Sequence, residues 1–261
     1  MATASDLSDY HAMKNILLQV VDGIKSSHSR FQKISEREDR CDMDAETMKR
    51  RCGGKYSCNH KGCIILKWPE DMTTFQQLFW DVKPASIIEL GSFNGGSALW
   101  MADMLRMLEI ECSIHSMDID PSLISDLAKD LKPKNVTFIQ GDSNKLGETF
   151  TDEFLKSLPR PLLVIEDVHV NLYGVMEFFH PYMSIGDYFI MEDLSPEVPD
   201  SSGYGLMESI PYKRIGSGDI TTVKKFLSDY ADHYSVDSFY TDLFGYNGVW
   251  NWHGYIRKMS N

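Results

Sequence analysis

Acidic residues end the short apolar runs of this sequence with unusual regularity. If the runs are parallel strands, their carboxyl ends meet at one edge of a sheet, where a ligand binds. Several carboxylates at one edge repel each other unless a cation or a hydroxyl-rich ligand sits among them. Without clustered cysteine or histidine, such carboxylates suit Mg²⁺ or Ca²⁺ with bound waters. The acids in question are Glu89, Asp118, Asp142, the pair Glu166-Asp167 and the pair Glu192-Asp193.

A glycine-rich turn, Glu89-Leu-Gly91-Ser-Phe-Asn-Gly95-Gly96-Ser97, follows the first of these runs. Its spacing is neither the dinucleotide fingerprint nor a Walker A loop, so we expect a nucleoside ligand without a pyrophosphate. Asp118 is placed to accept hydrogen bonds from ribose hydroxyls, and Asp142 to meet an adenine amino group. Glu89 would orient the turn. The residues predicted to bind this cofactor are Glu89, Gly91, Ser92, Gly95, Ser97, Asp118, Asp142 and Ser143.

The elements that must position these residues alternate between buried runs and helical patterns. A helix is predicted over 96–108, and others between the later runs. This alternation is typical of a parallel sheet built from βαβ units. We therefore predict a doubly wound, Rossmann-like α/β fold. Its predicted parallel strands are 86–90, 112–117, 136–139, 161–165 and 188–191.

The two ends of the chain have different patterns. Apolar residues at three- and four-residue spacing predict a helix over 6–37, and the polar stretch 40–62 is interpreted as a loop or lid. After a helix over 221–233, aromatic strands at 238–240 and 248–256, joined by Asn247-Gly248, predict an antiparallel pair that closes one sheet edge. We expect residues 1–66 to form an extension and 67–261 the main domain.

Composition narrows the classes of partner. With 26 basic and 38 acidic residues, the net charge is −12, and no basic stripe is present, so we do not expect nucleic acid binding. No apolar run reaches the ~20 residues of a membrane span, the start does not resemble a secretory signal, and we expect a cytoplasmic protein. The cysteine-bearing stretch 41–63 lacks the paired spacing of structural zinc sites.

The predicted N-terminal helix carries an apolar stripe, which consists of Tyr10, Met13, Ile16, Leu17, Val20, Val21 and Ile24. A stripe of this kind packs on another apolar surface. That surface belongs either to the chain's own domain or to a second subunit, and we expect a homo-oligomer.

The glycine turn, followed by Ser116-Met-Asp118-Ile-Asp120, resembles the S-adenosylmethionine (SAM) motifs of class I methyltransferases. The stretch 67–196 resembles, more narrowly, the cephalosporin hydroxylase/rhamnosyl O-methyltransferase (CmcI-like) family. The matching blocks include Lys67-x-Pro69-x-Asp71, Ile165-Glu-Asp-Val-His169 and Gly186-Asp-Tyr-Phe-Ile-Met-Glu192-Asp193. The resemblance implies a divalent metal beside the methyl donor, held by Glu166, Glu192 and Asp193. The family usually has Asp where Glu166 stands, so Asp167 is the alternative ligand.

These observations predict a SAM-dependent, Mg²⁺-assisted O-methyltransferase that acts on a small hydroxylated molecule such as a secondary metabolite, a sugar or a catechol-like compound. Mg²⁺ would lower the pKa of the acceptor hydroxyl, with His169 as the base and Asp167 beside it. One alternative is a hydroxylase of the same family, but this sequence lacks the iron-binding triad that an iron oxygenase needs. The other alternative is an inactive cofactor-binding scaffold. In a purely structural interpretation, the acids after residues 165 and 191 cap the following helices.

Overall fold

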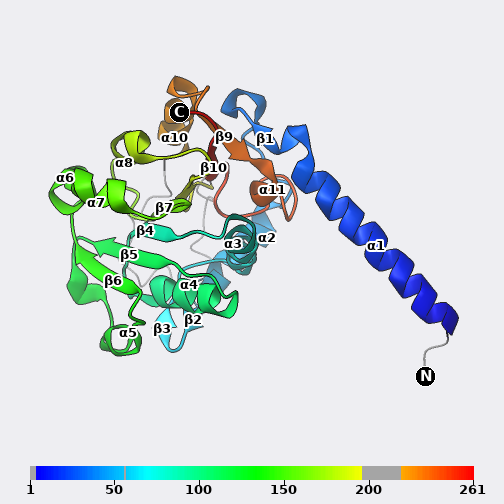
Figure 1. The fold of residues 1–261 in the computed structure, drawn as a ribbon, viewed down its shortest axis with the longest axis horizontal. Helices are drawn as coiled ribbons and strands as arrows, with labels where there is room; N and C mark the ends of the chain where they lie inside the picture. Colours follow the sequence, from blue (N-terminus) through cyan, green and yellow to red (C-terminus); the bar gives the residue numbers. More distant parts are fainter. Residues whose placement is uncertain (1–3, 56, 196–218) are drawn as a thin grey trace.

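The computed structural model describes residues 4–55, 57–195 and 219–261. Its centre is an eight-stranded sheet in the order β1-β9-β10-β8-β7-β4-β5-β6 (Figure 1), and a two-stranded sheet pairs β2 with β3. The five strands from β8 to β6 are parallel, whereas β10 and β1 run antiparallel to their neighbours. This is the predicted doubly wound, Rossmann-like α/β fold with an antiparallel edge.

The five parallel strands lie where the sequence predicts them, to within one residue at each end. Leu90 at the end of β4 pairs with Met117 on one side and with Glu166 on the other, so the carboxyl ends of these strands are level. The acids that follow the strands therefore meet at one edge. The bounds are β4 Ser86–Leu90, β5 Ser113–Asp118, β6 Val136–Gln140, β7 Leu162–Glu166 and β8 Tyr188–Met191.

Two apolar cores form because alternate residues of each strand face opposite sides of the sheet. Ile88 and Val164 pack toward α8 (Leu172–Phe179) and α10 (Ile220–Asp229). Ile87 and Leu163 pack toward α3 (Pro69–Val82) and α4 (Gly96–Met107) on the other face. Three further helices in the described part of the chain connect these strands: α5 Asp126–Leu131, α6 Leu146–Thr149 and α7 Asp152–Ser157.

The antiparallel edge is present, but its predicted strands and turn are wrong. The strands are β9 (Tyr234–Asp237) and β10 (Tyr255–Lys258), while 238–240 lies in the short helix α11 (Ser238–Thr241). The Asp237 side chain accepts a hydrogen bond from the Phe239 amide, which starts a helix instead of continuing the strand. Asn247-Gly248 lies within the long connection between α11 and β10, so it is not the hairpin turn. The aromatic residues there signal burial, not strand.

The N-terminal part also differs from its prediction. Helix α1 (Ala4–Ser26) ends well before residue 37, because Ser27 is extended and caps a 3-10 turn. The chain then adds β1 (Phe31–Gln32), which pairs with β9. The stretch 40–62 is not a plain loop: it contains α2 (Ala45–Lys55), the strand β2 (Asn59–His60) and the buried Met48.

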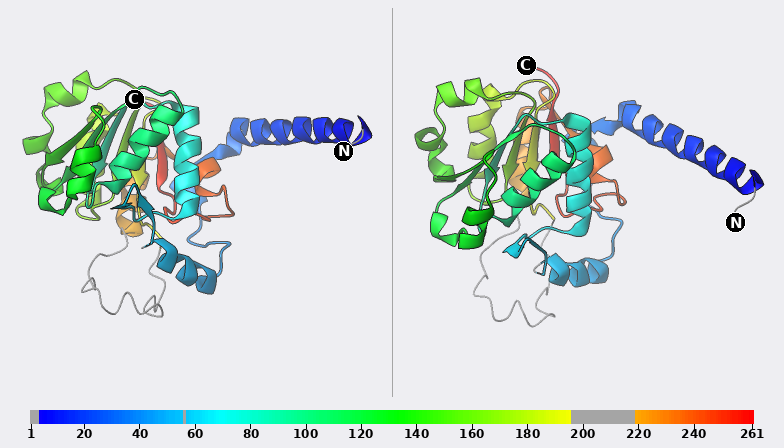
Figure 2. Two further views of the ribbon diagram at one scale, coloured as in Figure 1. Left: turned by 90° about the horizontal axis from the view of Figure 1, so that it is seen from below. Right: turned by 60° about the horizontal axis from the view of Figure 1, so that its bottom comes forward.

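Figure 2 shows α2 and the hairpin of β2 and β3 (Cys63–Ile64) together at one end of the sheet. The Ile64 amide donates to Asn94 Oδ1 at 2.9 Å, which attaches the hairpin to the loop before α4. Four cysteines in the described part of the chain, Cys41, Cys58, Cys63 and Cys112, are free thiols. Of the helices that the structure describes, none has the length and apolar character that a membrane span requires.

Candidate functional site

The glycine turn after β4 approaches the loop after β7 so closely that a side chain has no room. Gly91 has φ +109°, and a Cβ atom added there would lie 2.8 Å from the Asp167 carbonyl oxygen. The Asp167 amide in turn donates to the Leu90 carbonyl at 2.8 Å. Gly95, with φ +83°, caps the start of α4. These contacts bring the predicted cofactor turn and the predicted metal-binding loop side by side.

Glu89 ties this turn to its neighbours from inside the sheet. Its carboxylate accepts a hydrogen bond from Ser97 Oγ of α4 at 2.5 Å and another from the Ser116 hydroxyl of β5. Ser116 Oγ also lies 2.6 Å from Ser92 Oγ. Complete burial raises the pKa of Glu89 to about 7, although these hydroxyls and Lys67 favour the charged form.

Asp118 and Asp142 follow the next two strands. Asp118 Oδ2 accepts from the Phe93 amide at 2.8 Å, and its Oδ1 accepts from the Asp120 amide at 3.0 Å. Asp118 thereby fixes the glycine turn against the end of β5. Asp142 accepts from the Asn144 amide at 2.9 Å, and Ser143 beside it is buried. All eight residues predicted to bind the cofactor thus lie in β4, in the glycine turn and at the start of α4, or at the ends of β5 and β6.

Three potential metal ligands converge at the ends of β7 and β8. In the described part of the chain, Asp167, His169 and Asp193 are the residues whose ligand atoms lie within 4.8 Å of one another. His169 Nε2 lies 3.5 Å from Asp167 Oδ1 and 3.4 Å from Asp193 Oδ2. We call these residues the ligand trio. Two carboxylates that face one imidazole can hold a divalent cation or share a proton.

The backbone is strained at two of these residues. His169 has φ +56° and Asp193 has φ +54°, a left-handed conformation that side chains other than glycine rarely adopt. His169 Nδ1 is buried and has no hydrogen-bond partner. Strained conformations and unpaired buried atoms cost free energy, and they concentrate at functional sites.

Two buried lysines balance the acids. Lys55 Nζ of α2 lies 2.5 Å from Asp193 Oδ1. Lys67 Nζ lies 2.8 Å from Glu192 Oε1 and 3.5 Å from Asp167 Oδ2. Burial works against both ammonium charges, yet the surrounding carboxylates raise the pKa of each lysine above its usual value. Lys55 therefore occupies, as a cation, one face of the ligand trio.

The other two predicted metal ligands are engaged elsewhere. Glu192 accepts from Lys67, as described above. Glu166 Oε1 accepts from the amides of Val168 and His169 at 3.2 and 2.8 Å, while its Oε2 is buried without a partner. Burial raises the pKa of Glu166 to about 7. The structure places Asp193, a predicted metal ligand, and Asp167, the predicted alternative to Glu166, in the ligand trio together with the predicted base His169, whereas Glu166 and Glu192 lie outside it.

His169 and Asp193 have opposite shifts. Burial lowers the pKa of His169, but Asp193 and Asp167 outweigh this effect and raise it to about 9. Burial raises the pKa of Asp193, but Lys55 and His169 outweigh this effect and hold it well below its usual range. In the absence of another cation, the trio is an imidazolium between two carboxylates.

Sequence reasoning missed three charged residues of this site. Lys55 lies in the stretch interpreted as a loop, and the sequence presents Lys67 and Asp71 only as parts of a family motif. Asp71 is fully buried, and burial together with the Glu192 charge raises its pKa to about 8. A signal for Lys55 was available: it follows the buried Met48 by seven residues, two helical turns, so both share the inward face of α2.

An aromatic pair borders the same region. Trp68, just before α3, and Trp250 have ring centroids 4.5 Å apart, and Lys55 Nζ lies 5.6 Å from the Trp250 ring. Trp68 is buried, whereas Trp250 is partly exposed. Trp250 therefore presents an aromatic face near the ligand trio.

Known proteins are similar to this chain over most of its length. The family model for rhamnosyl O-methyltransferase/CmcI matches residues 53–259. The rhamnosyl O-methyltransferase of Mycobacterium leprae (strain TN) is 24% identical over 194 residues, which cover 73% of this chain and 79% of that protein. The one from Mycobacterium tuberculosis (strain H37Rv) is 22% identical over 196 residues, covering 74% and 75%.

Two solved structures of CmcI superpose on this fold. The apo structure of CmcI-N160 is 26% identical with a TM-score of 0.61, and it covers 79% of this chain and 78% of its own. A CmcI-D160 structure described with Mg and SAM is 26% identical with a TM-score of 0.60, covering 78% of each chain. The chain belongs to the rhamnosyl O-methyltransferase/CmcI family and is a SAM-dependent O-methyltransferase.

Proposed function

We propose that this enzyme methylates a hydroxyl group of a small molecule with the help of a divalent cation bound by Asp167 and Asp193. The observation that carries the proposal is the direct contact between the glycine turn at Gly91 and the loop at Asp167. A methyl donor held by the turn and an acceptor held by the carboxylates would be neighbours. Methyl transfer needs this proximity, because the sulfonium already carries the activation and the protein supplies positioning and deprotonation.

In this proposal, the donor lies along the ends of β4, β5 and β6. Gly91, Ser92 and Gly95 would let the backbone approach it, and Asp118 would accept hydrogen bonds from its ribose hydroxyls. Glu89 and Ser97 would hold the turn in shape, while Asp142 and Ser143 would lie near the adenine. The hydrogen bonds of Glu89 and Asp118 support this assignment, since they fix the turn before any ligand binds.

The ligand trio fits a divalent cation by its chemistry. Mg²⁺ is commonly held by one or two carboxylates and completes its shell with water and substrate oxygens. The carboxylates of Asp167 and Asp193 offer oxygen ligands that lie within 4.8 Å of each other, close enough to share one divalent cation. When bound, the cation would lower the pKa of the acceptor hydroxyl and orient it toward the donor.

His169 is the proposed proton acceptor for that hydroxyl. Its Nε2 lies between the two carboxylates, which hold the ring in place and stabilise the imidazolium after proton uptake. Beside a divalent cation, the pKa of His169 would fall from about 9 toward the physiological range, because like charges repel. Neutral His169 would then be available as a base.

The partly exposed Trp250 supports an acceptor with a ring. Sugars and aromatic rings both pack flat against aromatic side chains, and a bound ring would add buried apolar area. The alternative of an iron-dependent hydroxylase finds less support. The described ligand trio has one histidine and two carboxylates, whereas the facial triad of such oxygenases has two histidines and one carboxylate.

Calorimetric titration with S-adenosylhomocysteine, with and without Mg²⁺, tests the proposal. We expect micromolar binding in both conditions, with an additional heat when Mg²⁺ is present. Asp118→Ala should weaken binding by about ten- to a hundredfold, because a charge-assisted hydrogen bond contributes ~1.5–3 kcal/mol. The matched control is Asp120→Ala, whose side chain caps only a 3-10 turn. Unchanged affinity in Asp118→Ala would remove that residue from the donor site, and absence of any Mg²⁺ effect would reject the metal.

A further inference from the structure

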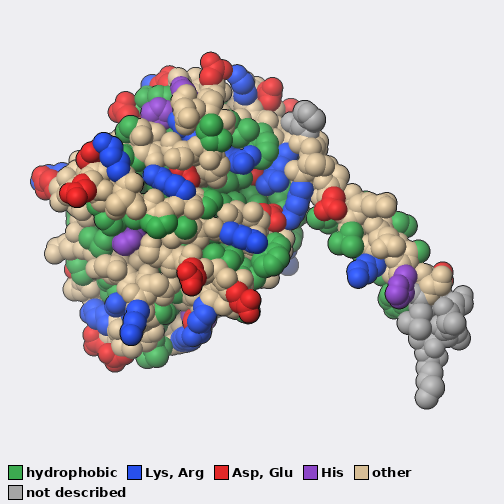
Figure 3. Space-filling model, in the orientation of Figure 1, with side chains coloured by type: hydrophobic (Ala, Val, Ile, Leu, Met, Phe, Trp, Pro, Cys, Tyr) green, Lys and Arg blue, Asp and Glu red, His purple; other side chains and the backbone are tan. Residues whose placement is uncertain are grey.

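Helix α1 projects away from the rest of the molecule (Figures 1 and 2). Near its C-terminal end, Lys25 Nζ contacts Asp81 Oδ1 at 2.6 Å and anchors the helix to α3. Along its length, large apolar side chains are exposed in the single chain, each by 42% to 63%. Figure 3 shows hydrophobic side chains along the helix. They are Tyr10, Met13, Ile16, Leu17, Leu18, Val20, Val21 and Ile24.

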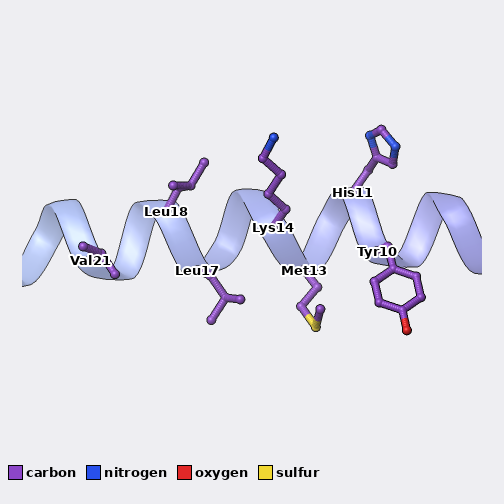
Figure 4. A pocket seen from close by; sticks show the side chains of 7 residues that line it. All are labelled: Tyr10, His11, Met13, Lys14, Leu17, Leu18 and Val21. Atoms are coloured by element: carbon purple, nitrogen blue, oxygen red, sulfur yellow. The ribbon is translucent and has the colours of Figure 1, made fainter. Parts of the chain in front are cut away.

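All of these side chains except Leu18 form one stripe. Figure 4 shows Tyr10, Met13 and Leu17 on one side of the helix, and Leu18, Lys14 and His11 on the other. The residues around this part of the helix all belong to α1, so a second surface would have to cover the stripe. Exposed apolar stripes of this size on a well-formed helix are typical of interaction surfaces.

The spacing of the stripe matches a coiled-coil seam. Tyr10, Met13, Leu17, Val20 and Ile24 follow one another at intervals of three, four, three and four residues. This is the heptad pattern in which alternate positions face a partner helix. Opposite the seam, the helix carries polar residues such as Asn15, Gln19 and Asp22, which stay in water.

We propose that the occupant of this seam is α1 of a second copy of this chain, packed parallel in a two-stranded coiled coil. The charges beside the seam support the parallel orientation. In a parallel coiled coil, the residue just before the first core position of a heptad, here Tyr10, faces the residue five positions further along on the other helix. Asp9 would then face the partner's Lys14, and the symmetric pair repeats the contact, whereas an antiparallel pair places an uncharged residue opposite each of them.

The charge of α1 argues against an anionic membrane as the occupant. The helix carries Asp6, Asp9 and Asp22 but only Lys14 and Lys25, so its net charge is −1. Helices that bind anionic membrane surfaces are rich in lysine and arginine on the polar face. The whole chain, at −12, would add to the repulsion.

The size of the seam sets the expected affinity. A 23-residue helix is about 35 Å long, but the seam spans only about two heptads. Stable interfaces bury roughly 1,200–2,000 Å² in total, and two such helices approach the lower limit of that range. We therefore expect a reversible dimer with a dissociation constant in the range of about 1–100 μM.

Sedimentation equilibrium of the full chain, over protein concentrations on both sides of that range, tests the inference. The wild type is expected to pass from monomer to dimer as its concentration rises. Leu17→Glu should remain a monomer, because it places a charge in the seam, whereas the matched control Gln19→Glu on the polar face should dimerise as the wild type does. Each variant should bind S-adenosylhomocysteine like the wild type, since α1 lies apart from the cofactor residues. This inference is therefore independent of the proposed function.

Charge exchange tests the orientation. Asp9→Lys should weaken the dimer several-fold, and the double variant Asp9→Lys/Lys14→Asp should restore it, because each charge again faces its opposite. A wild-type protein that stays monomeric at 200 μM would overturn the inference, and its sedimentation with phosphatidylserine vesicles would identify a membrane as the occupant. A dimer that survives Leu17→Glu would show that another surface forms it. Equal weakening in the single and double charge variants would overturn the parallel orientation.

Discussion

At the ends of β4 and β5, carboxylates are held by serine hydroxyls and backbone amides, whereas at the ends of β7 and β8 they are held by lysines and a histidine. Glu89 accepts from Ser97 and Ser116, and Asp118 accepts from two amides. Asp193 and Glu192 instead face Lys55 and Lys67. The same sheet edge therefore has two halves. In the methyl-donor half, at the ends of β4 and β5 and called the donor half below, neutral hydroxyls and amides hold the carboxylates. In the charged half, at the ends of β7 and β8, lysines and His169 hold them.

The difference indicates how each half meets its ligand. Neutral donors fixed by the backbone keep their positions when a cofactor binds, so the donor half is preorganised. In the charged half, Lys55 already neutralises Asp193, and a divalent cation has to compete with it. Five buried or half-buried acids surround only two lysines and His169. The five acids are Asp71, Glu166, Asp167, Glu192 and Asp193. Burial raises the pKa of Asp71 to about 8 and that of Glu166 to about 7, so uptake of a further cation would be accompanied by loss of protons from these carboxyls.

Asp193→Asn should have the largest effect and should separate the two halves. The variant loses one of the two carboxylates of the ligand trio, so we expect Mg²⁺ binding to disappear and kcat/KM to fall by at least about a hundredfold. Affinity for S-adenosylhomocysteine should stay within about twofold of the wild type, because Asp193 makes no contact with the donor half. Calorimetry for both ligands and steady-state kinetics measure these quantities.

The matched control is Asp103→Asn, which also removes a carboxylate from a cluster of basic side chains, His60 and Lys61, but in α4 away from the trio. It should leave both affinities unchanged. Thermal unfolding checks that Asp193→Asn is folded, since an unpaired buried Lys55 destabilises the protein. An equal loss of cofactor affinity in a folded Asp193→Asn protein would show that the two halves are not independent.

The sequence predicts the donor half better than the charged half, for a physical reason. Strands and glycine turns follow from local pattern, and the acids at strand ends follow from the strands. The direction in which each side chain points does not follow from local pattern. Glu166 and Asp167 are adjacent, but only Asp167 belongs to the ligand trio, because the Glu166 carboxylate accepts hydrogen bonds from the amides of its own loop. Lys55 arrives from α2, far away in sequence, and nothing near the strand ends indicates it.

The C-terminal edge makes the same point about local pattern. Aromatic alternation predicts strands over 238–240 and 248–256, yet a single capping carboxylate, Asp237, turns the first into a helix. The pattern indicates that these residues are buried, which is correct for Tyr240 and Tyr255. Which backbone conformation buries them depends on tertiary contacts.

Lys55→Met should have the next largest effect, in the opposite direction to Asp193→Asn. Removing a buried ammonium 2.5 Å from Asp193 Oδ1 frees that carboxylate, and we expect Mg²⁺ to bind at least about tenfold more tightly. Methionine keeps most of the length of the side chain and its apolar stem beside Trp250. Without Mg²⁺ the variant should be less stable than the wild type, and saturating Mg²⁺ should raise its melting temperature more.

Lys156→Met, which removes an exposed lysine paired with Asp152 on α7, is the control and should change neither quantity. If Lys55→Met binds Mg²⁺ no better than the wild type, Lys55 does not compete with the cation. If it binds Mg²⁺ more weakly, Lys55 supports the metal-bound state instead of competing with the cation.

The pH dependence of metal binding is the finest test, because His169 links both carboxylates of the trio. Below a pKa of about 9, His169 is protonated and repels the cation. Mg²⁺ affinity should therefore rise with pH, by at most tenfold per pH unit, and level off above about pH 9.

The free energy of unfolding of the metal-free protein changes with pH in the opposite direction. A histidine whose folded pKa is raised above its ordinary 6.5 stabilises the metal-free fold fully below pH 6.5, and this contribution is lost as pH rises through about 9. Between pH 6.5 and 9, the metal-free protein should therefore lose stability, while the stabilisation that Mg²⁺ adds should increase.

His169→Gln keeps a polar side chain that does not titrate, so its Mg²⁺ affinity should change less with pH between pH 7 and 9 than that of the wild type. The same slope in His169→Gln would assign the effect to the buried carboxyls Asp71 and Glu166, whose raised pKa values of about 8 and 7 also favour metal binding at higher pH.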